Sequence, residues 1–219
     1  MPSIKAVIFD LDGVIVASEP VYNELFLQWA RDHAVEFYEA DFQRYIGSTW
    51  QDLLQTINTT FQKSFDVRQE QNDIVQRIIK HIAQVGIPLK ENIEETLQQL
   101  KPHYRLGVTS SSPRLVVERI LKHHGLFNYF DVITTIEDVR YPKPHPEPYQ
   151  ITMRKLKTKP ETTVIIEDSL NGARAGVAAG AFVYVLPDAR LPDEKFAVLL
   201  NNTGKIIHGF DELIQDLLG

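Results

Sequence analysis

The sequence KAVIFDLDGVI, at residues 5–15, contains the segment that decides the fold. Residues 7–9 are consecutive apolar residues without polar alternation, which is typical of a parallel strand buried on both faces. Asp10 and Asp12 follow this strand, and Gly13 then allows the backbone to bend freely. Because open α/β sheets bind ligands at the carboxyl ends of their strands, this pair of acids indicates a metal-binding or reactive site.

The composition limits the kinds of protein that this chain could be. Its 219 residues, 43% of them hydrophobic, suffice for one large domain or a domain with an insertion. The net charge of −6, without a basic block, counts against nucleic acid as a partner. The absence of cysteine excludes disulfides, thiolate metal sites and cysteine nucleophiles.

We expect neither a membrane span nor a signal peptide from this sequence. No long apolar run is free of charge, so we expect no membrane span and no membrane partner. The apolar N-terminal segment carries Asp10 and Asp12, where a signal peptide needs an uninterrupted apolar region. We therefore expect a soluble, cytoplasmic protein, and the sequence does not predict its oligomeric state.

From about Glu19 to about Val85 the pattern is helical. Apolar residues recur at spacings of three and four along 22–30, 50–57 and 74–82, which predicts three amphipathic helices. We find no convincing strand in this region. The sequence therefore predicts an all-helical insert at 16–85, within an α/β domain formed by 1–15 and 86–219.

Strands and helices alternate again after the insert. The apolar runs predict further strands at 105–109, 130–134, 162–166 and 181–185. Helices are expected at 92–100, from Pro113 with Ser112 as its N-cap, at 147–156, through 173–179 and at 211–218. This alternation predicts an α/β fold with a Rossmann-like, three-layer parallel sheet core.

Polar side chains follow four of the predicted strands. They are Asp10 and Asp12, then Ser110 and Ser111, then Lys143, and finally Glu167 and Asp168. In a parallel sheet these strand ends share one edge, so we expect the side chains to converge there. Four carboxylates held together repel one another, and a divalent cation with one lysine would offset that charge. Ligands that are all oxygen favour Mg²⁺ over zinc.

The four motifs together resemble the haloacid dehalogenase-like hydrolase superfamily. They are DxDG after the first strand, Ser110 after the second, Lys143-Pro144 in a loop, and Glu167-Asp168-Ser169 after the fourth. They span nearly the whole chain in the order that this superfamily shows. The helical insert resembles the cap of its subgroup that contains β-phosphoglucomutase and phosphoglycolate phosphatase. The resemblance implies that residues 16–85 form an inserted all-α helical cap domain.

The resemblance implies two-step phosphoryl transfer from a small phosphorylated metabolite, such as a sugar phosphate. Asp10 would form an aspartyl-phosphate, and Asp12 would protonate the leaving oxygen and later accept a proton from water. Mg²⁺ would be bound by Asp10, the backbone carbonyl of Asp12 and Asp168, with Glu167 as a ligand or a support. Ser110, Ser111 and Lys143 would bind the phosphoryl oxygens. Dehalogenases of the superfamily lack the second acid, so Asp12 favours phosphate chemistry over carbon–halogen cleavage.

The chain departs from the family pattern in the cap. Tyr22 stands where related enzymes often have a histidine, three residues after Glu19. Trp50 follows Gly47 and Ser48 where the mutases use an arginine. These departures weaken the phosphomutase alternative. We expect Glu19, Tyr22, Gly47, Ser48 and Trp50 to line a substrate pocket, although Tyr22 and Trp50 also fit the apolar face of a helix.

Three functions other than a Mg²⁺-dependent phosphatase share some of these features. A phosphomutase of the β-phosphoglucomutase type would need a second phosphate site in the cap. A phospho-accepting receiver domain also combines Asp, Mg²⁺ and Lys on a parallel sheet, but the late position of Glu167 and Asp168 and the large insert count against it. A binding protein with a decayed site is not supported, because every expected catalytic residue type is present.

Overall fold

The computed structural model describes residues 3–38, 41, 50–187 and 193–219. The chain divides into two compact units, one formed by Met1–Ala17 with Pro88–Gly219 and the other by Ser18–Ile87. None of the helices within the described residues combines the length and the apolar character that a membrane span requires.

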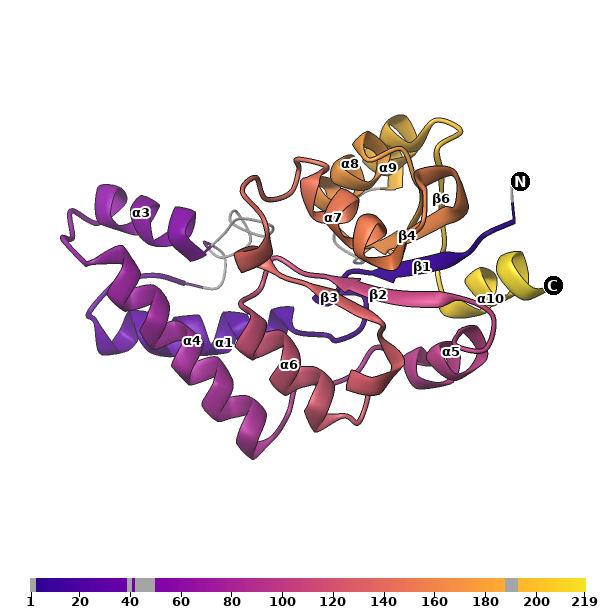
Figure 1. The fold of residues 1–219 in the computed structure, drawn as a ribbon. Coiled ribbons are helices and arrows are strands. Elements are labelled where there is room, and N and C mark those ends of the chain that lie inside the picture. The colour runs from indigo at the N-terminus through magenta and orange to yellow at the C-terminus, as the bar shows by residue number, and fades with distance from the viewer. Residues whose placement is uncertain (1–2, 39–40, 42–49, 188–192) are drawn as a thin grey trace. The chain divides into compact units, whose positions relative to one another are not determined.

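A six-stranded, wholly parallel sheet lies at the centre of the first unit (Figure 1). The strands, in the order β3-β2-β1-β4-β5-β6, are β1 (Ala6–Phe9), β2 (Arg105–Thr109), β3 (Val132–Thr134), β4 (Thr163–Glu167), β5 (Phe182–Val185) and β6 (Gly204–Ile206). Every residue of β1 and β4 is buried, as the apolar runs at their centres predict. These two strands are central neighbours, so their carboxyl ends emerge side by side.

Helices cover both faces of this sheet, which gives the predicted three layers (Figure 1). One face carries α7 (Glu147–Leu156), α8 (Leu170–Ala178) and α9 (Asp193–Leu200). The other carries α5 (Ile93–Leu100), α6 (Arg114–His123) and α10 (Phe210–Leu218). Short 3₁₀ segments lie at η2 (Phe127–Tyr129), η3 (Ile136–Asp138) and η4 (Pro160–Thr162). The predicted α/β class with a Rossmann-like parallel sheet is confirmed.

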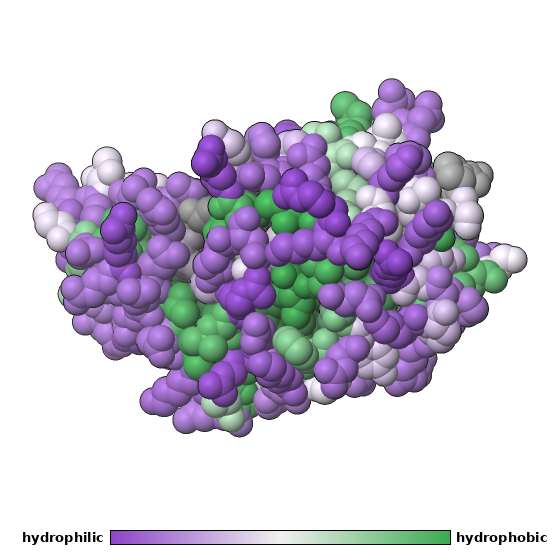
Figure 2. Space-filling view, in the orientation of Figure 1, coloured by the Kyte–Doolittle hydropathy of each residue, from purple (hydrophilic) through white to green (hydrophobic). Residues whose placement is uncertain are grey.

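The surface follows from this layering. Figure 2 shows mostly hydrophilic side chains, with hydrophobic ones visible in the region that the sheet edge at β3 occupies in Figure 1. Val132 and Ile133, on that edge strand, are only half-buried. The core beneath α7 is apolar, and Ile8, Tyr149 and Ile165 belong to the cluster that β1, α7 and β4 share.

The second unit is helical in its described residues. It contains α1 (Glu19–Asp32), α3 (Trp50–Thr60) and α4 (Val67–Gln84), and both α1 and α3 pack against α4. Its interior is aromatic, with Phe26 and Trp29 at a ring separation of 5.2 Å. Asp66 caps α4 by accepting hydrogen bonds from two backbone N–H groups in its first turn.

The structure corrects several predicted boundaries. The sixth strand, β6, and helix α9 were not predicted. The strand expected at 130–134 begins only at Val132, because Phe130 is the C-cap of the 3₁₀ segment η2. Ser112 is not the N-cap of α6, since Pro113 holds that position and the Ser112 hydroxyl bonds to another residue.

Candidate active site

The turn after β1 positions the first two acids. The backbone N–H of Asp10 donates to Ile166 of β4 at 2.9 Å, which extends the pairing of the two strands past Phe9. Gly13 then adopts a φ of +81° and closes the turn with a hydrogen bond to Val16. A Cβ at Gly13 would lie 1.7 Å from Oδ2 of Asp168. The glycine is therefore required both for the turn and for the approach of Asp168.

Lys143 joins three elements of the core unit. Its buried Nζ donates to Asp10 Oδ1 at 2.5 Å, to Glu167 Oε1 at 2.7 Å and to the carbonyl of Thr109 at 3.1 Å. These contacts use all three N–H donors of the ammonium group. Glu147 orders the preceding loop, because its carboxylate accepts the N–H groups of Arg140 and Tyr141.

Glu167 is fully buried, and both of its carboxylate oxygens are hydrogen-bonded. Oε1 accepts the Tyr149 hydroxyl at 2.6 Å in addition to Lys143. Oε2 accepts the N–H groups of Asp168 and Ser169 and the hydroxyl of Ser169. The ring of Tyr149 also lies under the Lys143 ammonium, 4.9 Å from its centroid. Tyr149 was not predicted as a site residue, because an aromatic on the apolar face of a helix cannot be distinguished by sequence from a core residue.

The serines after β2 differ in their environments. Ser110 is buried, Ser111 is exposed, and Ser112 is half-buried. The Ser112 hydroxyl donates to Asp12 Oδ2 at 2.9 Å, while the Ser110 hydroxyl lies 3.5 Å from the same oxygen. Ser112 was predicted only as a helix cap. It is therefore a second residue of the site, besides Tyr149, that the sequence did not predict.

Three carboxylates lie close enough together to share a cation. Asp10, Glu167 and Asp168 each offer one oxygen, and these oxygens lie within 4.8 Å of one another. Such an oxygen-only donor set suits a hard divalent ion such as Mg²⁺. Only one cationic side chain, Lys143, pairs with this cluster among the described residues.

The pKa values of Asp10 and Asp168 show that negative charge on these two acids is unfavourable in the folded protein. Burial raises the pKa of Asp10 to about 8, and the neighbouring carboxylates of Glu167 and Asp12 add to the effect against the opposing Lys143. Burial, together with Glu167 and Asp10, also raises the pKa of Asp168 well above its usual value. Burial acts to raise the pKa of Glu167 too, but Lys143 and the surrounding donors outweigh it and lower that pKa.

The predicted pocket residues of the helical insert lie in the second unit or outside the described residues. Glu19 and Tyr22 lie in the first two turns of α1, and Trp50 begins α3. Tyr22 and Trp50 meet edge to face with ring centroids 6.0 Å apart. Gly47 and Ser48 lie outside the described residues. A substrate pocket formed by these five residues therefore stays a prediction.

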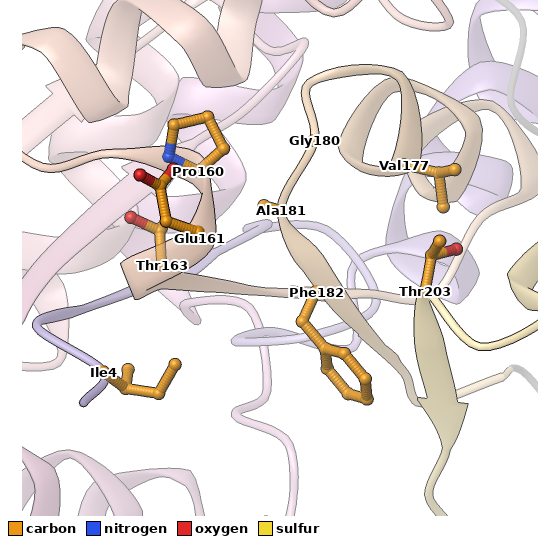
Figure 3. A pocket seen from close by; sticks show the side chains of 9 residues that line it. All are labelled: Ile4, Pro160, Glu161, Thr163, Val177, Gly180, Ala181, Phe182 and Thr203. Carbon is orange, nitrogen blue, oxygen red and sulfur yellow. The ribbon is translucent and has the colours of Figure 1, made fainter. Parts of the chain in front are cut away.

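A separate cavity lies at the opposite end of the strands (Figure 3). It has a volume of about 260 Å³ and is lined by the first residues of β4 and β5, Thr163 and Phe182, with Ile4 and Val177 nearby. The Thr163 hydroxyl already donates to a backbone carbonyl. Glu161 is the one charged residue in its lining, so the residues that line this cavity do not form a catalytic site.

Comparison with known proteins identifies the family. Residues 7–186 match the family model described as haloacid dehalogenase-like hydrolase, which covers most of the chain. The chain belongs to the haloacid dehalogenase-like hydrolases. The family predicted from the four motifs is thereby confirmed, and the protein is an enzyme of the hydrolase class.

Individual relatives agree with this assignment. The chain is 29% identical over 191 residues to pyrophosphatase PpaX of Bacillus cereus, and the match covers 84% of this chain and 85% of that protein. CbbY from Rhodobacter sphaeroides, solved with phosphate, has a TM-score of 0.85 at 24% identity, with 96% of each chain covered. β-Phosphoglucomutase from Clostridium difficile has a TM-score of 0.80 at 21% identity, covering 98% of this hydrolase and 96% of that chain.

Proposed function

We propose that this hydrolase is a Mg²⁺-dependent phosphatase that acts on a small phosphate monoester through an aspartyl-phosphate on Asp10. The observation that carries the proposal is the convergence of Asp10, Asp12, Lys143 and Asp168 at the carboxyl ends of neighbouring strands. The relatives named for phosphate chemistry agree with it, since the pyrophosphatase PpaX aligns over most of both chains.

The two acids after β1 would divide the chemistry. The Asp10 carboxylate would attack phosphorus as the bond to the leaving oxygen breaks, and Asp12 would give that oxygen its proton. In the second step Asp12 would take a proton from water, whose oxygen attacks the phosphorus. The bond between Asp10 and phosphorus then breaks, and phosphate leaves. Each acid returns to its starting state.

The metal assignment follows from the donor set. Asp10, Asp168 and the backbone carbonyl of Asp12 would hold Mg²⁺, and the close approach of Asp168 to Gly13 supports this grouping. When bound, the ion would stabilise the negative charge of the phosphoryl group in the transition state. Both carboxylate oxygens of Glu167 accept hydrogen bonds from donors of this chain, so we assign it to holding Lys143 and the turn after β4.

The phosphoryl oxygens would be bound by Ser110, Ser111 and Lys143. Lys143 has no spare donor here, so binding phosphate would require it to exchange one of its three contacts. We propose that residues 16–85 form the cap of this hydrolase. The cap would choose the substrate, with Glu19, Tyr22, Gly47, Ser48 and Trp50 as candidate contacts.

The test is phosphate release from a panel that contains sugar phosphates, small carboxylated phosphate esters and inorganic pyrophosphate, with Mg²⁺ and with EDTA. We expect release that requires the metal, and the preferred compound identifies the substrate class. If pyrophosphate were the preferred substrate, the substrate class would be a phosphoanhydride and not a phosphate monoester. A protein that binds Mg²⁺ but releases no phosphate from any compound would refute the phosphatase proposal. Conversion of a sugar phosphate in an assay primed with a bisphosphate would support the phosphomutase alternative.

The affinity for Mg²⁺ is expected to increase with pH. Because the pKa of Asp10 is raised to about 8 and that of Asp168 is raised as well, the metal-free site holds at least one proton at neutral pH. Mg²⁺ must displace each bound proton, so the affinity should fall about tenfold or more for each pH unit below 8. Calorimetric titration in two buffers of different ionisation enthalpy measures the released proton. An affinity that does not change between pH 6 and 8 would contradict this prediction.

A further inference from the structure

The Asp12 carboxyl group is held on one side only. Its Oδ2 accepts the hydroxyl of Ser112 at 2.9 Å, a normal hydrogen bond, whereas Ser110 lies at the outer limit of 3.5 Å. Its Oδ1 is buried and has no hydrogen-bond partner among the described residues. Buried polar atoms are nearly always paired, so an unpaired one in a reactive cluster points to a contact made by a ligand.

Ser112 is itself fixed by the sheet and the following helix. Its backbone N–H donates to the Ser110 hydroxyl oxygen at 3.0 Å, and the Ser110 N–H continues the sheet by donating to Thr134 at 3.0 Å. Pro113, the next residue, is the N-cap of α6 and has a constrained φ of −60°. The hydroxyl that contacts Asp12 thus stands on a rigid support, as an orienting group must.

We propose that Ser112 is a positioning residue that fixes Asp12 through Oδ2, so that Oδ1 is the oxygen that passes the proton to the leaving group. This inference rests on the proposed function of Asp12 as the acid. With Oδ2 accepting the serine hydroxyl, the proton of the neutral acid sits on Oδ1 and moves to the leaving oxygen as its bond to phosphorus breaks. The same Oδ1 later takes one proton from the attacking water, which restores the acid.

The test compares leaving groups that differ in their need for a proton. A nitrophenolate leaves without protonation, whereas an alkoxide does not, so a misplaced acid slows only the alkyl ester. The rate of the first step, measured as release of the alcohol in a single turnover, separates the acid role from the later proton transfer from water, which both substrates share. For Ser112→Ala we expect this rate with an alkyl phosphate such as glycerol phosphate to fall about tenfold, less than the roughly 10²–10⁴-fold of a whole general acid, because the acid is displaced and not removed. With p-nitrophenyl phosphate the same rate should change less than about twofold, since the acid contributes little to that step. Ser112→Thr retains the hydroxyl and should restore hydrolysis of the alkyl ester.

Two further variants make the outcome decisive. Thr162→Ala removes a hydroxyl that donates to Lys159 at the opposite end of β4, and it should leave both substrates unaffected. Asp12→Asn should show the same leaving-group preference as Ser112→Ala, but more strongly. Ser112→Gly deletes the same hydroxyl and replaces the alanine variant if thermal unfolding shows that the latter does not fold.

The results separate this inference from the proposed function. Equal losses with both substrates, or no loss with either, would overturn the role of Ser112. If Asp12→Asn discriminates between the substrates and Ser112→Ala does not, only the inference fails. If wild-type protein hydrolyses the esters and Asp12→Asn shows no preference, the proposed role of Asp12 itself fails. Preferential loss in both variants, with recovery in Ser112→Thr, supports the assignment of Oδ1.

Discussion

Phosphate release is expected to fall by roughly 10⁴-fold or more when Asp10 is replaced by asparagine, because an amide cannot attack phosphorus to form the acyl phosphate. The change keeps the size of the side chain and leaves an oxygen that Lys143 can still contact. Residual turnover is measured as initial phosphate release at saturating Mg²⁺ with the preferred substrate from the panel.

The stability of the Asp10→Asn variant distinguishes lost chemistry from lost folding. Burial raises the pKa of Asp10 to about 8, so the folded, metal-free protein disfavours the charge that this variant removes. The thermal midpoint in EDTA should therefore not decrease. Asp211→Asn, at the exposed start of α10, is the matched control and should retain full activity. Activity in Asp10→Asn within tenfold of wild type would exclude Asp10 as the nucleophile.

Most of this site can be predicted from the sequence, because buried strands are recognisable as runs of apolar residues. β1 and the centre of β4 are apolar runs, and carboxylates follow each run directly, at Asp10 and at Glu167. A parallel sheet brings such ends to one edge, and β1 and β4 are indeed adjacent. The contacts from Lys143 to Asp10 and Glu167 follow from this shared edge, although the loop that carries Lys143 has no secondary structure of its own.

What the sequence did not predict depends on contacts or on weak local signals. β6 has only three residues, and Lys205 at its centre is exposed, so no apolar run marks it as a strand. Ser112 and Tyr149 contact acids distant in the sequence, and nothing local separates a helix-capping serine or a core aromatic from a residue of the site. These contacts with buried acids are known only once the three-dimensional arrangement of the strands is known.

Gly172 provides the strongest test of how the buried acid Glu167 is held. The first turn of α8 passes directly over this carboxylate, and a Cβ at Gly172 would lie 1.7 Å from Oε1 and 2.2 Å from Oε2. The contact cannot be relieved by a rotation into solvent, because Glu167 is fully buried and receives hydrogen bonds from Lys143 and Tyr149. Either the helix or the carboxylate must therefore move.

Gly172→Ala is expected to destabilise the protein by about 3 kcal/mol, at the upper end for overpacking a core. Helix propensity alone predicts the opposite sign, since alanine in a helix is more stable than glycine by up to about 1 kcal/mol. Gly209→Ala is the matched control, because Gly209 is extended and has nothing within 4 Å of the added Cβ. Chemical denaturation of the three proteins measures the difference.

If Gly172→Ala were as stable as wild type, the α8 turn would not confine Glu167, and the support that Glu167 gives Lys143 would need another explanation. A destabilised Gly172→Ala beside an unchanged Gly209→Ala instead ties stability to the space above this carboxylate, and it predicts that the surviving folded protein loses phosphate release because the partner of Lys143 has moved.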